Sequence, residues 1–253
     1  MAIHKKKAAM AQASIPEKSE LAARIGGLPW ADIQHRLLET GYAVTGPILT
    51  PGECAALKAG FGQEGLYRSH IHMARHGFGQ GEYKYFSYPL PPVVAELRQA
   101  AYPHVAKAAD MWADRLGLEA GYPARLDDYL ALCHADGQAR PTPLILKYQV
   151  GDYNCLHQDL YGDRYFPFQM AVLLSDPGTD FEGGDFMLVE NRPRMQSVGH
   201  VPRLRQGQAI IFAVNERPRK GSRGYHRVKL RHGVSEITSG ERYTLGIIFH
   251  DAR

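Results

Sequence analysis

Two side chains that can bind a metal ion, His157 and Asp159, stand two positions apart near the end of the stretch from Tyr148 to Asp159. A strand is expected to end there, and on an extended backbone residues i and i+2 point to the same face. An imidazole and a carboxylate on one face are two of the three ligands of a non-haem Fe(II) site, which needs a second histidine. The pair therefore predicts a metal centre that a distant histidine completes.

A second His-x-Asp pair, His134 and Asp136, shows that the motif alone does not decide the question. With twelve histidines in the chain, a chance occurrence is expected. This copy follows a helix expected from Arg125 to Cys133 and precedes Gly137, so a turn at the helix end accounts for it. We therefore assign the metal chemistry to the copy at 157 and 159, which follows an expected strand.

The distal histidine must come from a later part of the chain. His226 lies inside a Gly-rich, basic stretch, and His250 follows the last expected strand, where a hydrogen bond is the simpler role for an imidazole. The available residues are His200, His226, His232 and His250.

Taken in order, the His-x-Asp pair, a distal histidine and a basic residue about ten positions later resemble the Fe(II)/2-oxoglutarate-dependent oxygenases. The resemblance covers residues 142–253 and implies Fe(II), 2-oxoglutarate and dioxygen as cofactor and co-substrates. It implies His157, Asp159 and His232 as metal ligands, because His232 stands ten residues before Arg242. Residues implied to contact 2-oxoglutarate are Arg242, Thr244 and Tyr148, with Tyr153 as the alternative tyrosine.

The chemistry of these residue types agrees with that role. A guanidinium binds a carboxylate through two parallel hydrogen bonds, and a hydroxyl two positions along the same strand face adds a third. His226, inside the basic stretch, is not favoured as a ligand.

More narrowly, the run from Tyr148 to His250 is similar to a bacterial oxygenase family described as performing oxidative demethylation of damaged DNA, by kinship with AlkB. The shared segments are Leu-His-Gln-Asp-Leu-Tyr-Gly-Asp, Phe-Glu-Gly-Gly-Asp-Phe, Glu-Asn-Arg-Pro-Arg and Arg-His-Gly-Val-Ser. The chain lacks the Arg-x-Asn segment of AlkB-type enzymes, and its His-to-Arg spacing is nearer the prolyl-hydroxylase-like pattern. The resemblance thus implies a dioxygenase that hydroxylates or oxidatively demethylates its substrate.

For this chain we consider three substrate classes and one function without catalysis. Alkylated nucleic acid, and with it DNA repair, is the first substrate class, and a protein side chain or a small metabolite are the alternatives. The rival from another class is a metal-binding β-barrel sensor without turnover. A carboxylate anchor at Arg242 and Thr244 argues against that rival, because a structural metal does not need one.

The periodicity predicts an α+β fold with helices first and strands afterwards. Regularly spaced strands favour a sandwich or jelly roll, and the resemblance implies a double-stranded β-helix core buttressed by the N-terminal helices. The predicted division is a disordered tail at 1–20, a helical N-terminal part at 21–141 packed on the core, and the jelly-roll core at 142–253. Helices are expected at 30–40, 51–61, 91–116 and 125–133, and core strands at 144–150, 166–174, 184–189, 208–214 and 243–250.

Composition limits the setting. No apolar run is long enough to cross a bilayer, and the three cysteines show no Cys-x-x-Cys spacing, so a reducing, cytoplasmic environment without a membrane partner is expected. The net charge of +4 is concentrated late in the chain. This basic segment is interpreted either as a solvated Gly/Pro-rich loop or as a footprint for the phosphates of a nucleic acid. Its basic residues are Arg217, Arg219, Lys220, Arg223, Arg227, Lys229 and Arg231.

Overall fold

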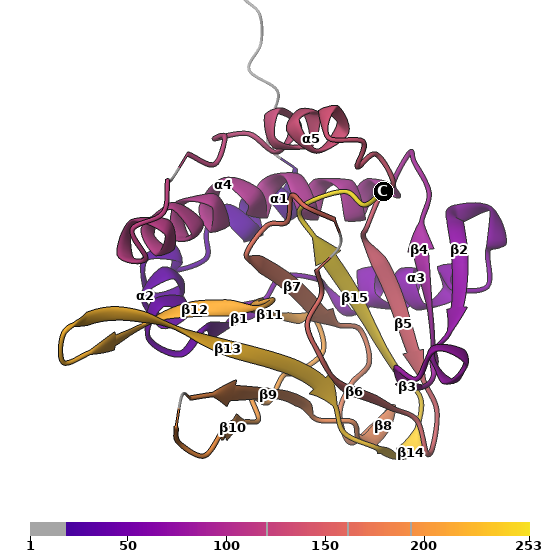
Figure 1. Ribbon diagram of the computed structural model, residues 1–253. Coiled ribbons are helices and arrows are strands. Elements are labelled where there is room, and N and C mark those ends of the chain that lie inside the picture. Colours follow the sequence, from indigo (N-terminus) through magenta and orange to yellow (C-terminus); the bar gives the residue numbers. More distant parts are fainter. Residues whose placement is uncertain (1–18, 120, 161, 193) are drawn as a thin grey trace, which may run out of the picture.

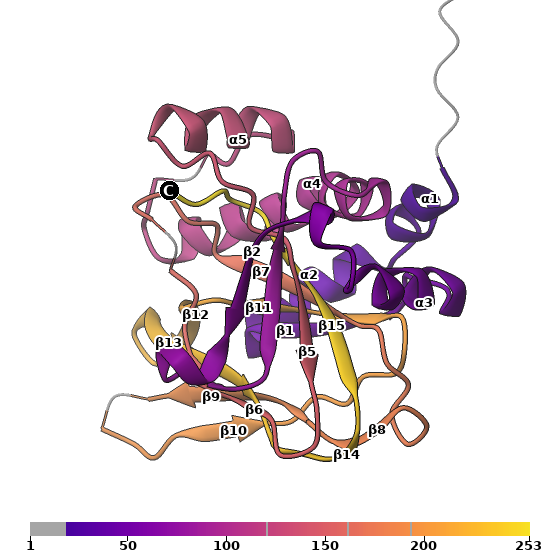
Figure 2. The ribbon, with the colours of Figure 1, turned by 90° about the vertical axis from the view of Figure 1, so that its right-hand side faces the viewer.

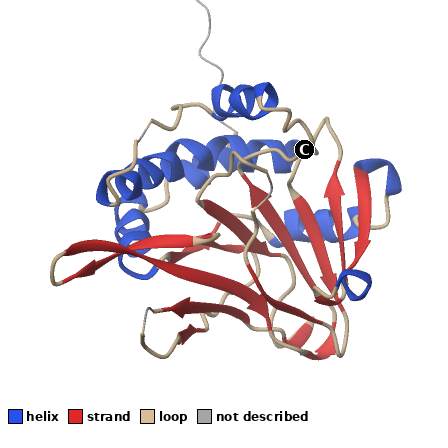
Figure 3. Cartoon of the chain, in the orientation of Figure 1, coloured by secondary structure: helices blue, strands red, loops and turns tan. Residues whose placement is uncertain are grey.

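A computed structural model describes residues 19–119, 121–160, 162–192 and 194–253. It has two main antiparallel sheets that face one another, and the helices gather on the far side of the larger sheet (Figure 1). Colouring by secondary structure shows the longer helices on this side and a short helical turn beside the smaller sheet (Figure 3). The architecture is a mixed α/β arrangement built mainly from antiparallel strands, as the sequence predicted. The expected tail lies outside the described residues, apart from its last two positions.

The helices form where the sequence places their signals. Thr50 and Glu53 make the expected capping box, in which each side chain accepts a hydrogen bond from the other's backbone N–H. Gly41 ends the second helix in the left-handed conformation, with φ of 82°. The long helix α4 begins at a proline, as its first-turn geometry allows. The helices are α1 (Glu20–Gly26), α2 (Trp30–Thr40), α3 (Pro51–Gly60), α4 (Pro92–Arg115) and α5 (Leu126–Ala135), with 3-10 turns η1 (Glu64–Leu66) and η2 (Met73–His76).

The larger sheet has seven strands in the order β1-β11-β7-β15-β5-β4-β2. Its outer face packs on α4 through aromatic contacts such as Trp112 on Phe168, whose ring centroids are 4.4 Å apart. The view turned by 90° shows α1, α3 and α4 beside this sheet (Figure 2). The strands are β1 (Tyr42–Pro47), β2 (Tyr67–His72), β4 (Glu82–Phe86), β5 (Leu144–Tyr148), β7 (Phe168–Leu173), β11 (Gln208–Ala213) and β15 (Arg242–Ile248).

The smaller sheet has the order β10-β9-β13-β6-β3, and β12 pairs with β13 beyond this path. The pair β12 and β13 forms a long hairpin that extends away from the body (Figure 1). A third, two-stranded sheet joins β14 and β8. The strands are β3 (Gly79–Gln80), β6 (Tyr153–His157), β8 (Phe181–Gly183), β9 (Phe186–Asn191), β10 (Val198–His200), β12 (Glu216–Gly221), β13 (Gly224–Val234) and β14 (Ile237–Gly240).

Two expectations differ from the structure. The N-terminal part at 21–141 is not only helical, because β1 and β2 form the two edges of the larger sheet and β4 lies beside β2. The basic segment is a β-hairpin and not a loop, and one of its arginines, Arg217, is buried. None of the helices in the described ranges is both long and apolar enough to cross a membrane.

Candidate active site

The three predicted metal ligands meet between the two sheets. His157 ends β6, Asp159 follows two residues later, and His232 lies on β13 directly across from His157 in the antiparallel register. Nε2 of His157 is 3.4 Å from Oδ1 of Asp159, and Nε2 of His232 is 3.3 Å from Oδ2. The two imidazole centroids are 4.2 Å apart. Two nitrogens and one oxygen therefore converge on one point from segments far apart in the chain.

The electrostatics of the cluster shift the pKa values of its three side chains in different directions. Burial alone would raise the pKa of Asp159, but hydrogen bonds and charges from His157 and His232 hold that pKa well below its usual range. Burial, together with the nearby His157, lowers the pKa of His232. For His157 burial acts to lower the pKa, but Asp159 outweighs it and raises the pKa. The carboxylate is thus ionised and the buried imidazole neutral, as metal coordination requires.

Neighbouring groups orient these side chains. The carbonyl of Cys155 lies 2.7 Å from Nδ1 of His157, which makes Nδ1 the protonated nitrogen and leaves Nε2 for a metal. Gln169 on β7 donates from its amide to Oδ2 of Asp159 at 2.9 Å. The sequence reasoning missed Gln169, although a lone amide within the apolar run Phe168–Leu173 was a usable signal. The ring of His232 packs on Phe212, with centroids 4.7 Å apart.

The predicted carboxylate anchor lies in the same cavity on the facing sheet. Arg242 and Thr244 alternate onto one face of β15, and the Arg242 guanidinium donates to Thr244 Oγ1 at 2.7 Å. Both side chains are buried. Gly184 makes room for the guanidinium, because a Cβ there would lie 2.8 Å from Cδ of Arg242. Tyr148 is also buried, with its ring centroid 5.7 Å from the guanidinium carbon.

Arg242 lacks an ion-pair partner among the described residues. Nε of Arg242 is buried and has no hydrogen-bond partner among the described residues. Burial lowers the pKa of the guanidinium. A buried cation is normally paired, because taking it out of water costs several kcal/mol. The anchor therefore has the geometry and the charge to receive an anion from the cavity.

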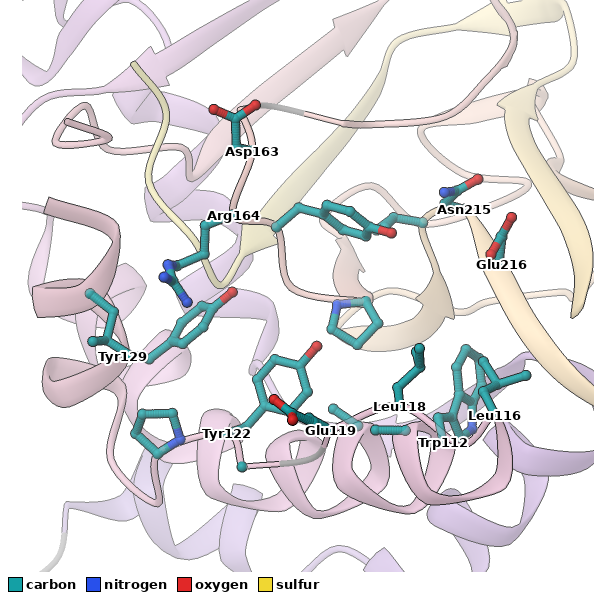
Figure 4. A pocket seen from close by; sticks show the side chains of 18 of the residues that line it. Trp112, Leu116, Leu118, Glu119, Tyr122, Tyr129, Asp163, Arg164, Asn215 and Glu216 are labelled. Carbon is teal, nitrogen blue, oxygen red and sulfur yellow. The ribbon is translucent and has the colours of Figure 1, made fainter. Parts of the chain in front are cut away.

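The cavity between the sheets has a volume of about 400 Å³ and contains all the residues named for metal and co-substrate. Its lining combines the ligands with apolar side chains from both sheets, among them Tyr83, Leu146 and Phe186. A second cavity, of about 650 Å³, lies between α4, α5 and the base of the hairpin and is lined by Trp112, Tyr122, Tyr129 and other residues (Figure 4). It shares no lining residue with the first, and the predicted metal ligands and carboxylate anchor line the smaller cavity.

Known proteins resemble this chain at the level of family and of fold. Residues 81–252 match the model of a protein family described as oxygenases that catalyse oxidative methylation of damaged DNA. The chain belongs to this oxygenase family. Two uncharacterised proteins from two strains of Mycobacterium tuberculosis are each 52% identical over 167 residues, which is 66% of this chain and 72% of each relative.

The fold of this oxygenase is similar to the folds of solved structures. A prolyl-4-hydroxylase from Pseudomonas putida matches with a TM-score of 0.54 at 15% identity, over 88% of this chain and 99% of the other. An oxidoreductase of the 2OG-Fe(II) oxygenase family from Burkholderia pseudomallei matches with a TM-score of 0.51 at 16% identity, over 88% and 92% of the two chains. The predicted oxygenase family is confirmed by the family match, and the two solved structures show a similar fold.

The other histidines weighed for this oxygenase lie elsewhere. His226 is exposed on the outer part of the hairpin, across from Arg219. His200 on β10 contacts the ring of Tyr42, with centroids 5.5 Å apart. His250 is buried, and its Nδ1 accepts a hydrogen bond from the backbone N–H of Phe166 at 3.1 Å. None of them approaches Asp159 as a member of the three-ligand group.

The second His-x-Asp pair is held by other partners. Nε2 of His134 lies 2.9 Å from the buried Asp251, and Arg164 donates to Asp136 at 2.5 Å. The expected helix-end turn is present, since Asp136 follows α5 and Gly137 has φ of 78°. Tyr153, the alternative to Tyr148, is exposed and does not line the cavity.

Part of the basic segment serves the fold. Arg217 donates from Nε and from a terminal nitrogen to Glu190, at 2.8 and 2.6 Å. Burial alone would raise the pKa of Glu190, but Arg192 and Arg217 lower it. Arg219 also reaches this carboxylate. The exposed basic residues of the hairpin are Lys220, Arg223, Arg227, Lys229 and Arg231.

Proposed function

We propose that this oxygenase binds Fe(II) through His157, Asp159 and His232 and binds 2-oxoglutarate through Arg242, Thr244 and Tyr148. The two facing sheets are then the double-stranded β-helix, or jelly roll, of the fold class. When bound, Fe(II) and 2-oxoglutarate would supply the electrons that activate dioxygen, which then oxidises a C–H bond of the substrate. Two imidazoles and a carboxylate are a donor set that suits Fe(II) and leaves one side of the ion open.

The observation that supports this proposal best is that Arg242 has no ion-pair partner among the described residues. A guanidinium this deeply buried, with one hydroxyl as its hydrogen-bond partner and an unsatisfied Nε, is matched by a carboxylate of a dicarboxylic acid. Tyr148 supplies a phenol whose pKa burial raises to about 12, so it remains a neutral hydrogen-bond donor or acceptor beside the acid. These residues bind and orient the co-substrate, and the apolar lining of the cavity excludes water.

Succinate release tests the catalytic proposal. Purified protein with Fe(II), ascorbate and 2-oxoglutarate is expected to form succinate slowly even without a substrate, and His232→Ala should abolish it. His226→Ala is the matched control, because this histidine is exposed and outside the cluster. Metal binding without any succinate would favour the non-catalytic sensor instead.

For the substrate we propose alkylated nucleic acid. The family description names damaged DNA, and the hairpin that carries His232 also carries five exposed basic side chains. Phosphates would contact these residues, while a base turned out of its stack would enter the cavity. The proposed phosphate contacts and the ligand His232 would then lie on one hairpin.

A protein side chain is the second substrate class, favoured by the similarity of the fold to a prolyl-4-hydroxylase. Salt dependence separates the two classes. Binding of a labelled methylated oligonucleotide should weaken steeply between 50 and 200 mM salt if phosphates are contacted, on the order of tenfold or more for a few contacts. Affinity for the oligonucleotide that does not change with salt contradicts the nucleic-acid proposal.

A further inference from the structure

A second group of metal-binding side chains lies on the edge of the larger sheet. His70 and His72 on β2 and Glu82 on β4 each offer one donor atom, and these atoms all lie within 4.8 Å of one another. Nε2 of His70 is 2.5 Å from a Glu82 carboxylate oxygen, and the two imidazole centroids are 4.5 Å apart. Among the described residues, this group and the one at 157, 159 and 232 are the two that meet this geometry.

The backbone explains why the three side chains converge. His70 and His72 are two positions apart on one strand and therefore share a face. In the antiparallel register β2 pairs with β4, and His72 lies directly opposite Glu82. Directly opposed residues on one face have Cβ atoms about 4.5–5.5 Å apart. The arrangement is thus fixed by strand pairing and not by a mobile loop.

This group is separate from the candidate active site. Tyr83, the next residue along β4, lines the cavity between the sheets. Glu82 precedes it on the strand and so points to the opposite face. There His70 meets the ring of Phe61, which follows α3, edge-on with centroids 6.3 Å apart. The sheet itself therefore lies between the two groups.

The positive charge of Lys84, on the same strand face as Glu82, does not prevent a metal ion from binding at this position. Lys84 lies opposite His70 in the register, but its ammonium group pairs with Glu64 at 2.6 Å and donates to the carbonyl of Phe61. The lysine charge is thereby neutralised locally. The side chains of His70 and Glu82 remain about a third and a quarter exposed, at 32% and 25%, so an ion can reach them from solvent.

We propose that His70, His72 and Glu82 form a second metal site that binds a divalent transition-metal ion, with Zn²⁺ the best match. Two imidazole nitrogens and one carboxylate are a three-ligand zinc set that leaves a fourth position for solvent. The ion would link the outermost strand β2 to β4. Because η2 follows His72 directly and Met73 lines the active-site cavity, the link would also restrain one wall of that cavity.

The test uses the full chain with the first group removed, as His157→Ala with Asp159→Ala. This protein should bind one Zn²⁺ per chain by isothermal titration calorimetry, and Co²⁺ should give a visible absorption band. Adding His72→Ala should weaken Zn²⁺ binding by about tenfold or more. His35→Ala is the matched control, because His35 is an exposed histidine 3.5 Å from a glutamate on α2 and belongs to neither group.

Glu82→Gln guards against a trivial loss of folding. The amide can still hydrogen-bond His70, so the metal-free protein should melt at the same temperature while Zn²⁺ affinity falls. The proposal is overturned if the starting protein binds no Zn²⁺, or if neither His72→Ala nor Glu82→Gln weakens the binding. Because the first group is absent throughout, failure of the proposed function would leave this result unchanged.

Discussion

Replacing Arg242 by methionine should remove 2-oxoglutarate binding without weakening the protein alone. The guanidinium is buried with an unsatisfied Nε and no carboxylate partner in the described residues. An unsatisfied buried polar group costs about 1–3 kcal/mol. Methionine fills similar space without that cost, so the free energy of unfolding of Arg242→Met should equal or exceed that of the wild type.

The ligand effect has the opposite sign. Two charge-assisted hydrogen bonds at about 1.5–3 kcal/mol each give about 3–6 kcal/mol, or roughly 10² to 10⁴ in affinity. For the wild type, 2-oxoglutarate at about 100 times its Kd adds about 2.7 kcal/mol. At about 2–4 °C per kcal/mol for a chain of this size, the midpoint should rise by about 5–11 °C. With affinity lower by roughly 10² to 10⁴, Arg242→Met should show a rise of at most about 2 °C at the same concentration.

Thermal unfolding without oxygen, with and without 2-oxoglutarate, measures both effects. The matched control is Arg217→Met, a buried arginine whose partner Glu190 is also buried. Removing that arginine leaves a buried carboxylate less compensated and should cost on the order of 3 kcal/mol. If Arg242→Met lowers the ligand-free midpoint as much as the control does, Arg242 has a structural partner and the reasoning is refuted.

Three further predictions concern other parts of the molecule. Gln169→Leu should weaken Fe(II) affinity by about 10–100-fold, measured by calorimetry without oxygen, because Asp159 loses its amide donor; unchanged affinity would exclude a positioning role. Burial lowers the pKa of His250 from 6.5 to about 4, so between these pH values only the unfolded chain binds this proton. The free energy of unfolding should therefore fall as pH drops below 6.5, by about 2 kcal/mol at pH 5. Urea unfolding at pH 7.5 and 5 should show a smaller loss of stability for His250→Gln than for the wild type. Lys229→Gln with Arg231→Gln should flatten the salt dependence of oligonucleotide binding by about two phosphate contacts, and an unchanged slope would place the phosphates elsewhere.

The helices were predictable because their signals are local. The capping box at Thr50 and the glycine stop at Gly41 act within one turn of the helix, and both helices have the expected bounds to within a residue. The strands with apolar runs, such as Phe168–Leu173, were predictable for the same reason. The ligand set and the carboxylate anchor rested on ordered spacing and family resemblance, and the structure brings all of these residues into one cavity.

What the sequence did not predict depends on distant partners. The Gly/Pro content of the basic segment favours a loop as one of its two interpretations, whereas the structure pairs the segment into a hairpin. Arg217 can be buried because it donates hydrogen bonds to the carboxylate of Glu190, which lies on another strand. Likewise Gln169 is explained by Asp159 and not by its own neighbours. Such pairings are set by sheet register, which single-sequence patterns specify only where one face is buried and apolar.

The cross-strand pairing of His232 with His157 limits how this protein can vary in length. Side chains on β13 alternate between the interior and solvent, so one extra residue between the hairpin tip and position 232 would turn the imidazole outward. The tip at 221–224 carries no such constraint, because the strands end there. The hairpin can therefore differ in length at its tip among relatives, while His232 keeps its register opposite His157.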